Sequence, residues 1–249
     1  MGQGILDRLR GRLWRARDRI TDLFKSSHRE DVFTRIYKGN LWGSQDSRSG
    51  VGSTSEATAN VVEALPALWK DYAIRSMVDA PCGDCNWMSR IAPALEMYTG
   101  MDIVRPLIEA NQRQYPHLNF RCADLTRDPL PTADAIHCRD CFQHLPTHMI
   151  LSALRNFEAS GARWLLLTTN ADVKTYHDVV IGGFRPINFL RPPFNFPRPV
   201  AEISEDRLGR TLALWDLRQS LAARFRARSG SEESERHASP ARNLQGERG

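Results

Sequence analysis

Strand and helix patterns alternate through residues 76–170, and this alternation restricts the fold more than any other feature of the chain. Alternation of this kind is typical of βα units that build a mostly parallel sheet with helices on both faces. We therefore expect an α/β fold with a Rossmann-like, doubly wound sheet of about seven strands and an antiparallel edge. The predicted strands are 76–80, 98–103, 119–124, 134–140, 162–170 and 210–219, and the predicted helices between them are 87–95, 105–114 and 147–160.

Three of these strands end in a carboxylate, namely Asp79, Asp102 and Asp124, which are 23 and 22 residues apart. Each interval is the length of one βα unit, so the three side chains should lie along one rim of the sheet, where ligands bind in doubly wound folds. The second carboxylate suits two ribose hydroxyls, and the third suits an adenine amino group. The first could orient its loop or meet an ammonium group, and the set predicts a pocket for an adenosine with a charged tail.

The loop after the first strand, within "MVDAPCGDCNWM" (77–88), helps to distinguish between the cofactors that contain an adenosine. A dinucleotide loop follows G-x-G-x-x-G, but the three positions hold Pro81, Gly83 and Asn86. Asp84 also places negative charge where a pyrophosphate would lie. The loop therefore favours S-adenosylmethionine, which carries a sulfonium and an ammonium, over NAD, and an NAD-dependent enzyme is kept as a third alternative.

On these residues the chain resembles class I S-adenosylmethionine-dependent methyltransferases. Val78-Asp79-Ala80-Pro81-Cys82-Gly83-Asp84-Cys85 follows the first motif of that family, with Pro81 and Cys85 in place of two glycines. The later motifs are matched by Gly100-Met101-Asp102-Ile103, by Ala123-Asp124-Leu125 and by "DAIHCRD" (134–140) with "FQHL" (142–145). Over about 33–218, the chain also resembles a bacterial methyltransferase-like set that shares "WGS…SGxGS", "DAPCGDxxWM" and "RPxNxxxPPF" segments.

The resemblance implies a role for each matching residue. The methionine part of the cofactor would contact Asp79, Pro81, Cys82 and Gly83, the ribose would contact Asp102 and Ile103, and the adenine would contact Asp124 and Leu125. Cys138 and Arg139 would present backbone near the sulfonium, and Arg48 would pair with the cofactor carboxylate. Asp140 and His144 would face the acceptor as catalytic residues, and His144 is the better base near neutral pH.

These assignments predict an enzyme that transfers a methyl group from S-adenosylmethionine to a small-molecule or glycan-like acceptor, with an oxygen acceptor favoured. A catalytically silent S-adenosylmethionine-binding module on the same fold is the alternative, because Pro81 and Cys85 alter the cofactor loop. Binding of the cofactor without turnover would separate the two.

The cysteines form two C-x-x-C pairs, Cys82–Cys85 and Cys138–Cys141. The 52 residues between the pairs far exceed the roughly 15–20 of a zinc ribbon, so we expect small buried thiols and no metal. The total of five cysteines is odd, which favours a reducing, cytoplasmic setting over a disulfide scaffold.

The net charge differs between the N-terminal segment and the rest of the chain. Residues 1–30 carry eight Lys/Arg and four Asp/Glu, whereas 31–225 hold 21 of each sign, which makes nucleic acid an unfavoured partner. Residues 5–24 have the pattern of an amphipathic helix that would lie on a membrane surface, on this domain or on a partner. No apolar run reaches the roughly 18–20 residues that cross a bilayer.

We therefore expect a basic amphipathic helix in 1–30, a cap and an access loop in 31–75, a methyltransferase-like domain in 76–225 and a disordered tail in 226–249. The oligomeric state is not indicated. Residues 183–200 hold five prolines and four phenylalanines, too apolar for a linker. This segment should pack as an ordered extended stretch or form a wall of the acceptor pocket, where Arg185, Asn188 and Arg191 would offer hydrogen bonds.

Overall fold

The structure is a computed structural model that describes residues 28–205 and 209–219. The predicted amphipathic helix at 5–24 and the predicted tail at 226–249 lie outside the described residues. Within the described ranges no helix has the length and apolar character that a bilayer crossing requires.

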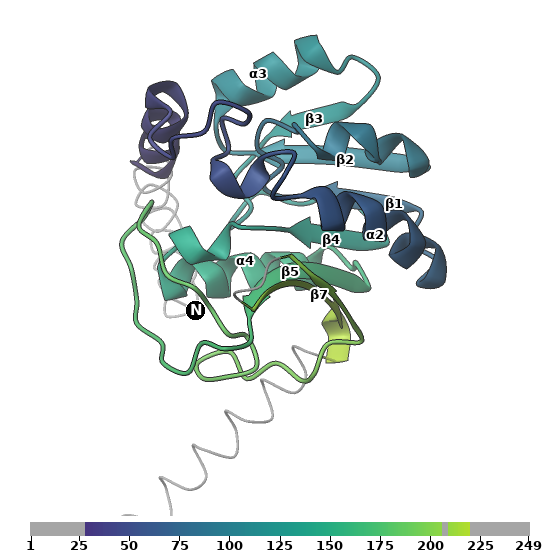
Figure 1. The fold of residues 1–249 in the computed structure, drawn as a ribbon, viewed down its shortest axis with the longest axis vertical. Helices are drawn as coiled ribbons and strands as arrows, with labels where there is room; N and C mark the ends of the chain where they lie inside the picture. The colour runs from purple at the N-terminus through teal and green to yellow at the C-terminus, as the bar shows by residue number, and fades with distance from the viewer. Residues whose placement is uncertain (1–27, 206–208, 220–249) are drawn as a thin grey trace, which may run out of the picture.

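Seven strands form one sheet in the order β3-β2-β1-β4-β5-β7-β6, which confirms the predicted fold class (Figure 1). The first five strands in this order are parallel, and β7 is antiparallel to both of its neighbours. The strands are β1 (Ser76–Asp79), β2 (Met97–Asp102), β3 (Asn119–Cys122), β4 (Ala135–Cys138), β5 (Trp164–Asn170), β6 (Ala201–Ser204) and β7 (Arg210–Asp216). The order reverses between β1 and β4, so the rim beside these two strands is the topological switch point.

Helices cover both faces of the sheet because the central strands bury side chains on both sides. Val78 and Ile136 pack in one core with the buried residues of α4 (Thr147–Ala159). Their neighbours Met77 and Ala135 pack in a second core with α2 (Ala59–Asp71). The third long helix, α3 (Arg105–Gln114), lies against β2 and β3.

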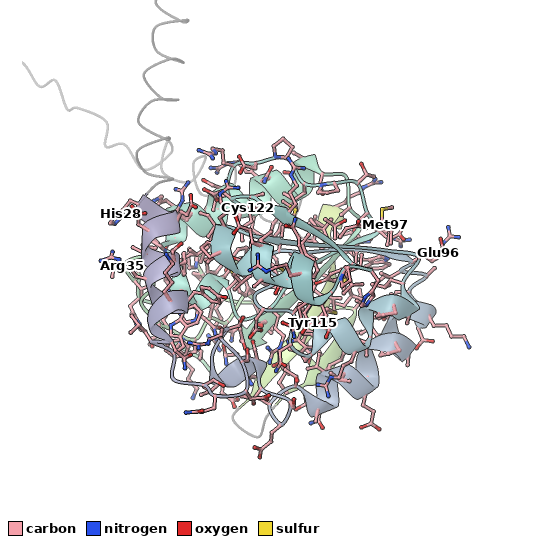
Figure 2. All side chains as sticks on the ribbon, turned by 90° about the horizontal axis from the view of Figure 1, so that it is seen from above. His28, Arg35, Glu96, Met97, Tyr115 and Cys122 are labelled. Carbon is pink, nitrogen blue, oxygen red and sulfur yellow. The ribbon has the colours of Figure 1, made fainter. Side chains whose placement is uncertain are left out.

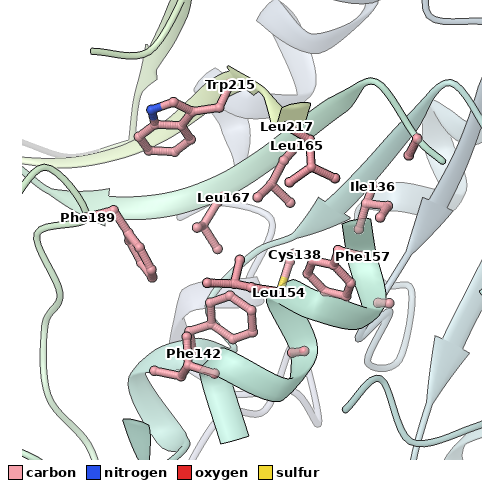
Figure 3. Close-up of a cluster of buried hydrophobic side chains, with 14 of the residues drawn as sticks. Ile136, Cys138, Phe142, Leu154, Phe157, Leu165, Leu167, Phe189, Trp215 and Leu217 are labelled. Carbon is pink, nitrogen blue, oxygen red and sulfur yellow. The ribbon is translucent and has the colours of Figure 1, made fainter. Parts of the chain in front are cut away.

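The α4 core extends into the Pro/Phe segment. Phe189, Phe194 and Phe196 are all buried in it, and Phe189 approaches Trp215 of β7 with ring centroids 6.5 Å apart. Figure 3 shows Phe189 and Trp215 beside Leu167 of this cluster. Residues 183–200 form neither helix nor strand, and most of their aromatic rings serve packing.

Three local predictions were wrong. Residues 87–95 do not form one helix but two short 3₁₀-helices, η2 (Met88–Arg90) and η3 (Ala92–Ala94), and Pro93 sits at the start of η3, where proline is tolerated. Strand β6 was not predicted, since four residues at a sheet edge carry little periodic signal. The final strand ends at Asp216 rather than at 219.

A helix over 28–39 lies at the carboxyl ends of the parallel strands and runs across the boundary predicted at residue 30. Figure 2 shows its His28 and Arg35 at one side of the sheet, opposite Glu96 and Met97 at the start of β2. This helix therefore stands over the rim where the three acidic side chains were expected.

Candidate active site

One open cavity lies along this rim, with about 1070 Å³ of empty space when the solvent at its mouth is included. It is lined by the loops after β1, β2 and β4, by the helix over 28–39 and by the access loop, residues 42–53. The cavity brings together the residues predicted for the cofactor, except Cys138, and the two predicted catalytic residues, Asp140 and His144.

The loop after β1 lines the cavity through Asp79, Pro81, Cys82 and Gly83. Gly83 adopts φ +54, and a Cβ there would lie 2.2 Å from the Ser49 hydroxyl oxygen, so this position requires glycine. The glycine lets the access loop approach the β1 loop without an intervening side chain.

Asp84 fastens the access loop to the β1 loop. Its carboxylate accepts hydrogen bonds from the Ser47 hydroxyl at 2.9 Å, the Arg48 amide at 2.6 Å and the Ser49 hydroxyl at 3.1 Å. The backbone amide of Asp84 in turn donates to the Ser49 hydroxyl at 2.9 Å. The negative charge that argued against a pyrophosphate therefore serves as an anchor, and it leaves the exposed Arg48 guanidinium at the cavity without an ion-pair partner among the described residues.

Asp102 closes β2 and is held by backbone amides. One carboxylate oxygen accepts from Val104 N at 2.9 Å and the other from Gly83 N at 3.2 Å. Burial nevertheless raises the pKa of Asp102 to about 6. Ile103 beside it also lines the cavity, so both residues predicted for the ribose are in place.

Asp124 meets a partner that the sequence did not reveal. Arg29 from the helix over 28–39 donates to one of its oxygens at 2.5 Å, and both groups are buried. The other oxygen accepts from the Thr126 amide at 2.9 Å and the Thr126 hydroxyl at 2.7 Å. A carboxylate has about four acceptor positions, so one remains for an adenine amino group. Leu125, the other residue predicted there, lines the cavity.

Asp79 is part of a buried trio with His137 of β4 and Tyr98 of β2. Its two oxygens lie 2.7 Å from His137 Nδ1 and 2.8 Å from the Tyr98 hydroxyl, which donates to it. The pairing of β1 with β4 places Asp79 directly opposite His137. Each carboxylate oxygen of Asp79 therefore already has a hydrogen-bond partner, and the His137 side chain also lines the cavity.

Four charged side chains form a network after β4. Arg139 donates to Glu205 at 2.5 and 3.0 Å and lies 3.2 Å from Asp140, while Arg210 reaches Asp140 at 3.1 Å. Arg139 also donates to the carbonyl of Gly52 at 2.8 Å, which ties the network to the access loop. Arg139 and Asp140 both line the cavity, but the Asp140 carboxylate is engaged by two guanidiniums.

His144 lies on η4 (Phe142–His144), and its ring is enclosed by aromatic neighbours. It stacks on Trp42 at 4.7 Å between centroids, and Phe184 lies at 5.7 Å. Its Nδ1 is 2.7 Å from the Gly183 carbonyl oxygen, to which it donates. This bond leaves Nε2 as the unprotonated nitrogen of the neutral ring. Burial lowers the pKa of His144, partly offset by the Gly183 hydrogen bond and the charge of Asp140.

The remaining predicted residues lie elsewhere. The Cys138 side chain is buried in the α4 core and does not line the cavity, as Figure 3 shows beside Leu154 and Phe157. Arg185 donates to the Phe142 carbonyl and Asn188 to the Ala171 carbonyl, so both hold the Pro/Phe segment on the domain. Neither they nor Arg191 line the cavity.

The cysteines do not converge. Burial raises the pKa of the Cys85 thiol to about 12 and that of the Cys138 thiol well above its usual range, so neither is a ready thiolate. Within 28–205 and 209–219 no group of three or more His, Cys, Asp or Glu side chains is placed to hold a metal ion.

Sequence reasoning missed Arg29, Tyr98, His137 and Glu205. His137 gave a usable signal, because a histidine between apolar residues of a buried strand needs a polar partner. Arg29 and Glu205 gave none, since their partners are 95 and 66 residues away.

Comparisons with known proteins agree with this geometry. Residues 77–160, about one third of the chain, match the family model described as "Methyltransferase domain". No curated protein sequence shows significant similarity to the chain.

Two solved structures share the fold at a TM-score of 0.51 and 13% identity. The first is the methyltransferase domain of bacterial-CtHen1-CN, and the aligned region covers 64% of this chain and 99% of that chain. The second is magnesium protoporphyrin IX methyltransferase (ChlM) from Synechocystis PCC 6803, and the aligned region covers 75% of this chain and 97% of that chain. A third, the methyltransferase domain of bacterial-CtHen1-C, is 16% identical at a TM-score of 0.42, and the 46% of this chain that aligns spans 66% of it. Residues 77–160 therefore resemble a methyltransferase domain, and the chain shares the Rossmann-like fold of these solved methyltransferases.

Proposed function

We propose that this protein transfers a methyl group from S-adenosylmethionine to an oxygen of a small-molecule or glycan-like acceptor. One observation carries the proposal: a single cavity is lined both by the strand-end carboxylates Asp79 and Asp102 and by His144. A cofactor on the carboxylates and an acceptor beside the imidazole would then share one enclosed space, and transfer would depend mainly on positioning.

The residues present fit S-adenosylmethionine. Gly83 lines the cavity, and Asp102 is a buried carboxylate with acceptor capacity left for ribose hydroxyls. The buried His137 Nε2 has no hydrogen-bond partner among the described residues, so a polar ligand is needed there. We assign Ile103 to the ribose, Asp124 and Leu125 to the adenine, and Arg48 to the cofactor carboxylate.

His144 is the base in this proposal. When bound, S-adenosylmethionine supplies an electrophilic methyl group on its sulfonium. The Nδ1–H bond to the Gly183 carbonyl holds the His144 ring so that Nε2 can take the proton of an acceptor hydroxyl. Because burial lowers its pKa, His144 is neutral at pH 7 and ready to accept that proton.

Asp140 has a positioning role here rather than a role as base. Two guanidiniums and the Gln143 amide, at 3.3 Å, already engage its carboxylate. Its backbone amide donates to the Thr168 hydroxyl at 2.8 Å, which fixes the turn that leads to His144.

The acceptor end favours a ligand with a flat or ring-shaped apolar face. Trp42 lines the cavity beside His144, and Phe184, which is 63% exposed, lies against the His144 ring. Such rings suit the apolar face of a sugar or a planar small molecule, whereas the neutral charge of 31–225 disfavours nucleic acid.

Calorimetry with S-adenosylhomocysteine tests the first half of the proposal. We expect the wild type to bind and Asp102→Ala to bind at least about 10-fold more weakly, because two acceptor interactions are lost. Glu96→Ala, an exposed carboxylate at the other end of β2, is the matched control. Absence of binding by the wild type would contradict the cofactor assignment.

Turnover tests the second half of the proposal, which is methyl transfer to an acceptor. The protein is incubated with methyl-labelled S-adenosylmethionine and a metabolite extract, and labelled products are found by mass spectrometry. A product that His144→Gln does not form supports the assignment of the base. If the cofactor binds and no acceptor is methylated, the protein is better explained as a catalytically silent binding module. The structural reason for this alternative is the altered cofactor loop, which has Pro81 and, at φ +55, Cys85.

A further inference from the structure

His137 is the one buried imidazole next to the cavity that the proposed mechanism does not yet use. It is 1% exposed, it lines the cavity, and its Nε2 has no hydrogen-bond partner within the described part of the chain. A buried polar atom without a partner is rare and costly, so its partner is expected to be a ligand.

The protonation of His137 follows from its contacts. Asp79 accepts from the Tyr98 hydroxyl on one oxygen and lies 2.7 Å from His137 Nδ1 on the other. A carboxylate in that position fixes the tautomer with the proton on Nδ1. The free Nε2 of the neutral ring is then a hydrogen-bond acceptor and requires a donor.

Charge narrows the identity of that donor. Burial and the charge of Asp79 raise the pKa of Tyr98 well above its usual range, so the phenol is neutral. With His137 in its neutral tautomer, the formal charge of the trio of Asp79, His137 and Tyr98 is that of the Asp79 carboxylate. Arg139, the guanidinium that lies 5.6 Å over the neighbouring Trp87 ring, is already paired with Glu205 and Asp140. The site consequently favours a donor that is also a cation.

We propose that His137 is a positioning residue that binds the α-ammonium group of the amino-acid part of S-adenosylmethionine. The ammonium donates to Nε2, and Asp79 and Tyr98 hold the imidazole in the accepting tautomer. This inference rests on the proposed function, and it replaces direct contact by Asp79, whose two oxygens already have partners. Arg48, across the β1 loop, is left for the carboxylate of the same amino-acid part.

Calorimetry with two ligands tests the inference. S-Adenosylhomocysteine carries the amino-acid part, and 5′-deoxy-5′-methylthioadenosine lacks it. In His137→Leu we expect the first to bind at least about 10-fold more weakly and the second to change less than about 2-fold, because a hydrogen bond to a charged group is lost only for the first. His148→Leu, on the exposed side of α4, is the matched control.

A second measurement follows the site in the wild type and uses a variant only to assign the signal. In ¹⁵N-histidine spectra of the wild type, the unprotonated Nε2 signal of His137 should move when S-adenosylhomocysteine is added and stay in place with 5′-deoxy-5′-methylthioadenosine. The signal is assigned by its loss in His137→Gln. A merely structural His137 would respond equally to both ligands.

The outcomes separate the two proposals. If the wild type binds S-adenosylhomocysteine but His137→Leu weakens both ligands equally, or weakens neither, the role of His137 is overturned and the cofactor assignment stands. If the wild type does not bind S-adenosylhomocysteine at all, the proposed function itself fails.

Discussion

The two ends of the cavity are built in different ways. At the nucleoside end, Asp102 is held by amides within 19 residues of it, and most of the polar groups come from strand ends or the loops that follow them. At the acceptor end, the carbonyl that orients His144 is 39 residues away and the arginine on β7 that reaches Asp140 is 70 residues away. The first end is built mainly by βα units, with Arg29 as a distant contribution, whereas the second depends on the assembly of distant segments.

This difference also shows in the chemistry of each end. The nucleoside end offers fixed acceptors on a rigid sheet rim, which is suited to one conserved type of ligand group. At the acceptor end, His144 is held between the access loop and residues 183–184, which are irregular segments. Loops on a rigid scaffold are where specificity varies, so the acceptor should be decided there.

The largest expected effect separates the two ends directly. His144→Gln should lower kcat by about 100-fold or more, because the general base is lost, and should leave the affinity for S-adenosylhomocysteine unchanged. Turnover of the labelled product and calorimetry give the two numbers, with His148→Gln as the control. Loss of cofactor affinity in the variant would mean that the ends are not separable.

Arg29→Met probes the long-range contact at the nucleoside end. Removing one partner of a buried ion pair leaves Asp124 uncompensated, and we expect the free energy of unfolding to fall by about 3 kcal/mol in urea titrations. The double variant with Asp124→Asn should recover part of this loss. A single-variant loss below about 1 kcal/mol would show that the helix over 28–39 is not held by this pair.

Asp84→Asn probes the contact between the two ends. The amide that replaces one oxygen cannot accept from Ser47, Ser49 and the Arg48 backbone together, so the access loop should open more often. We expect faster amide exchange at 47–49 and about 10-fold weaker binding of S-adenosylhomocysteine. Asp71→Asn, exposed at the end of α2, is the control. Unchanged amide exchange at 47–49 would mean that Asp84 does not hold the access loop in place.

The smallest expected effect is a pH dependence of ligand affinity at the nucleoside end of the cavity. Burial raises the pKa of Asp102 to about 6, so the group is a carboxylate above that pH and protonated below it. The affinity for S-adenosylhomocysteine should therefore fall a few-fold as pH drops from 7.5 to 5.5, since the neutral acid is a poorer acceptor for ribose hydroxyls. Calorimetry at both values checks this, and Asp102→Asn should be insensitive to pH.

Much of the fold was predictable because its signals are local. The predicted helix over 105–114 has the same bounds as α3, and five predicted strands overlap β1 to β5. The errors lie where the local signal is weak: η2 and η3 stand in place of one predicted helix that contains Pro93, and β6 has four residues at an edge.

The sequence by itself determined six of the seven strands and that Asp79, Asp102 and Asp124 lie at or just after the carboxyl ends of three of them, because side-chain period and turn chemistry act over a few residues. Only the tertiary structure decided what those groups touch. Arg29 reaches Asp124, His137 pairs with Asp79 at the cavity, and the Gly183 carbonyl selects the tautomer of His144. These contacts depend on which distant segments pack together, and no spacing in the chain specifies that.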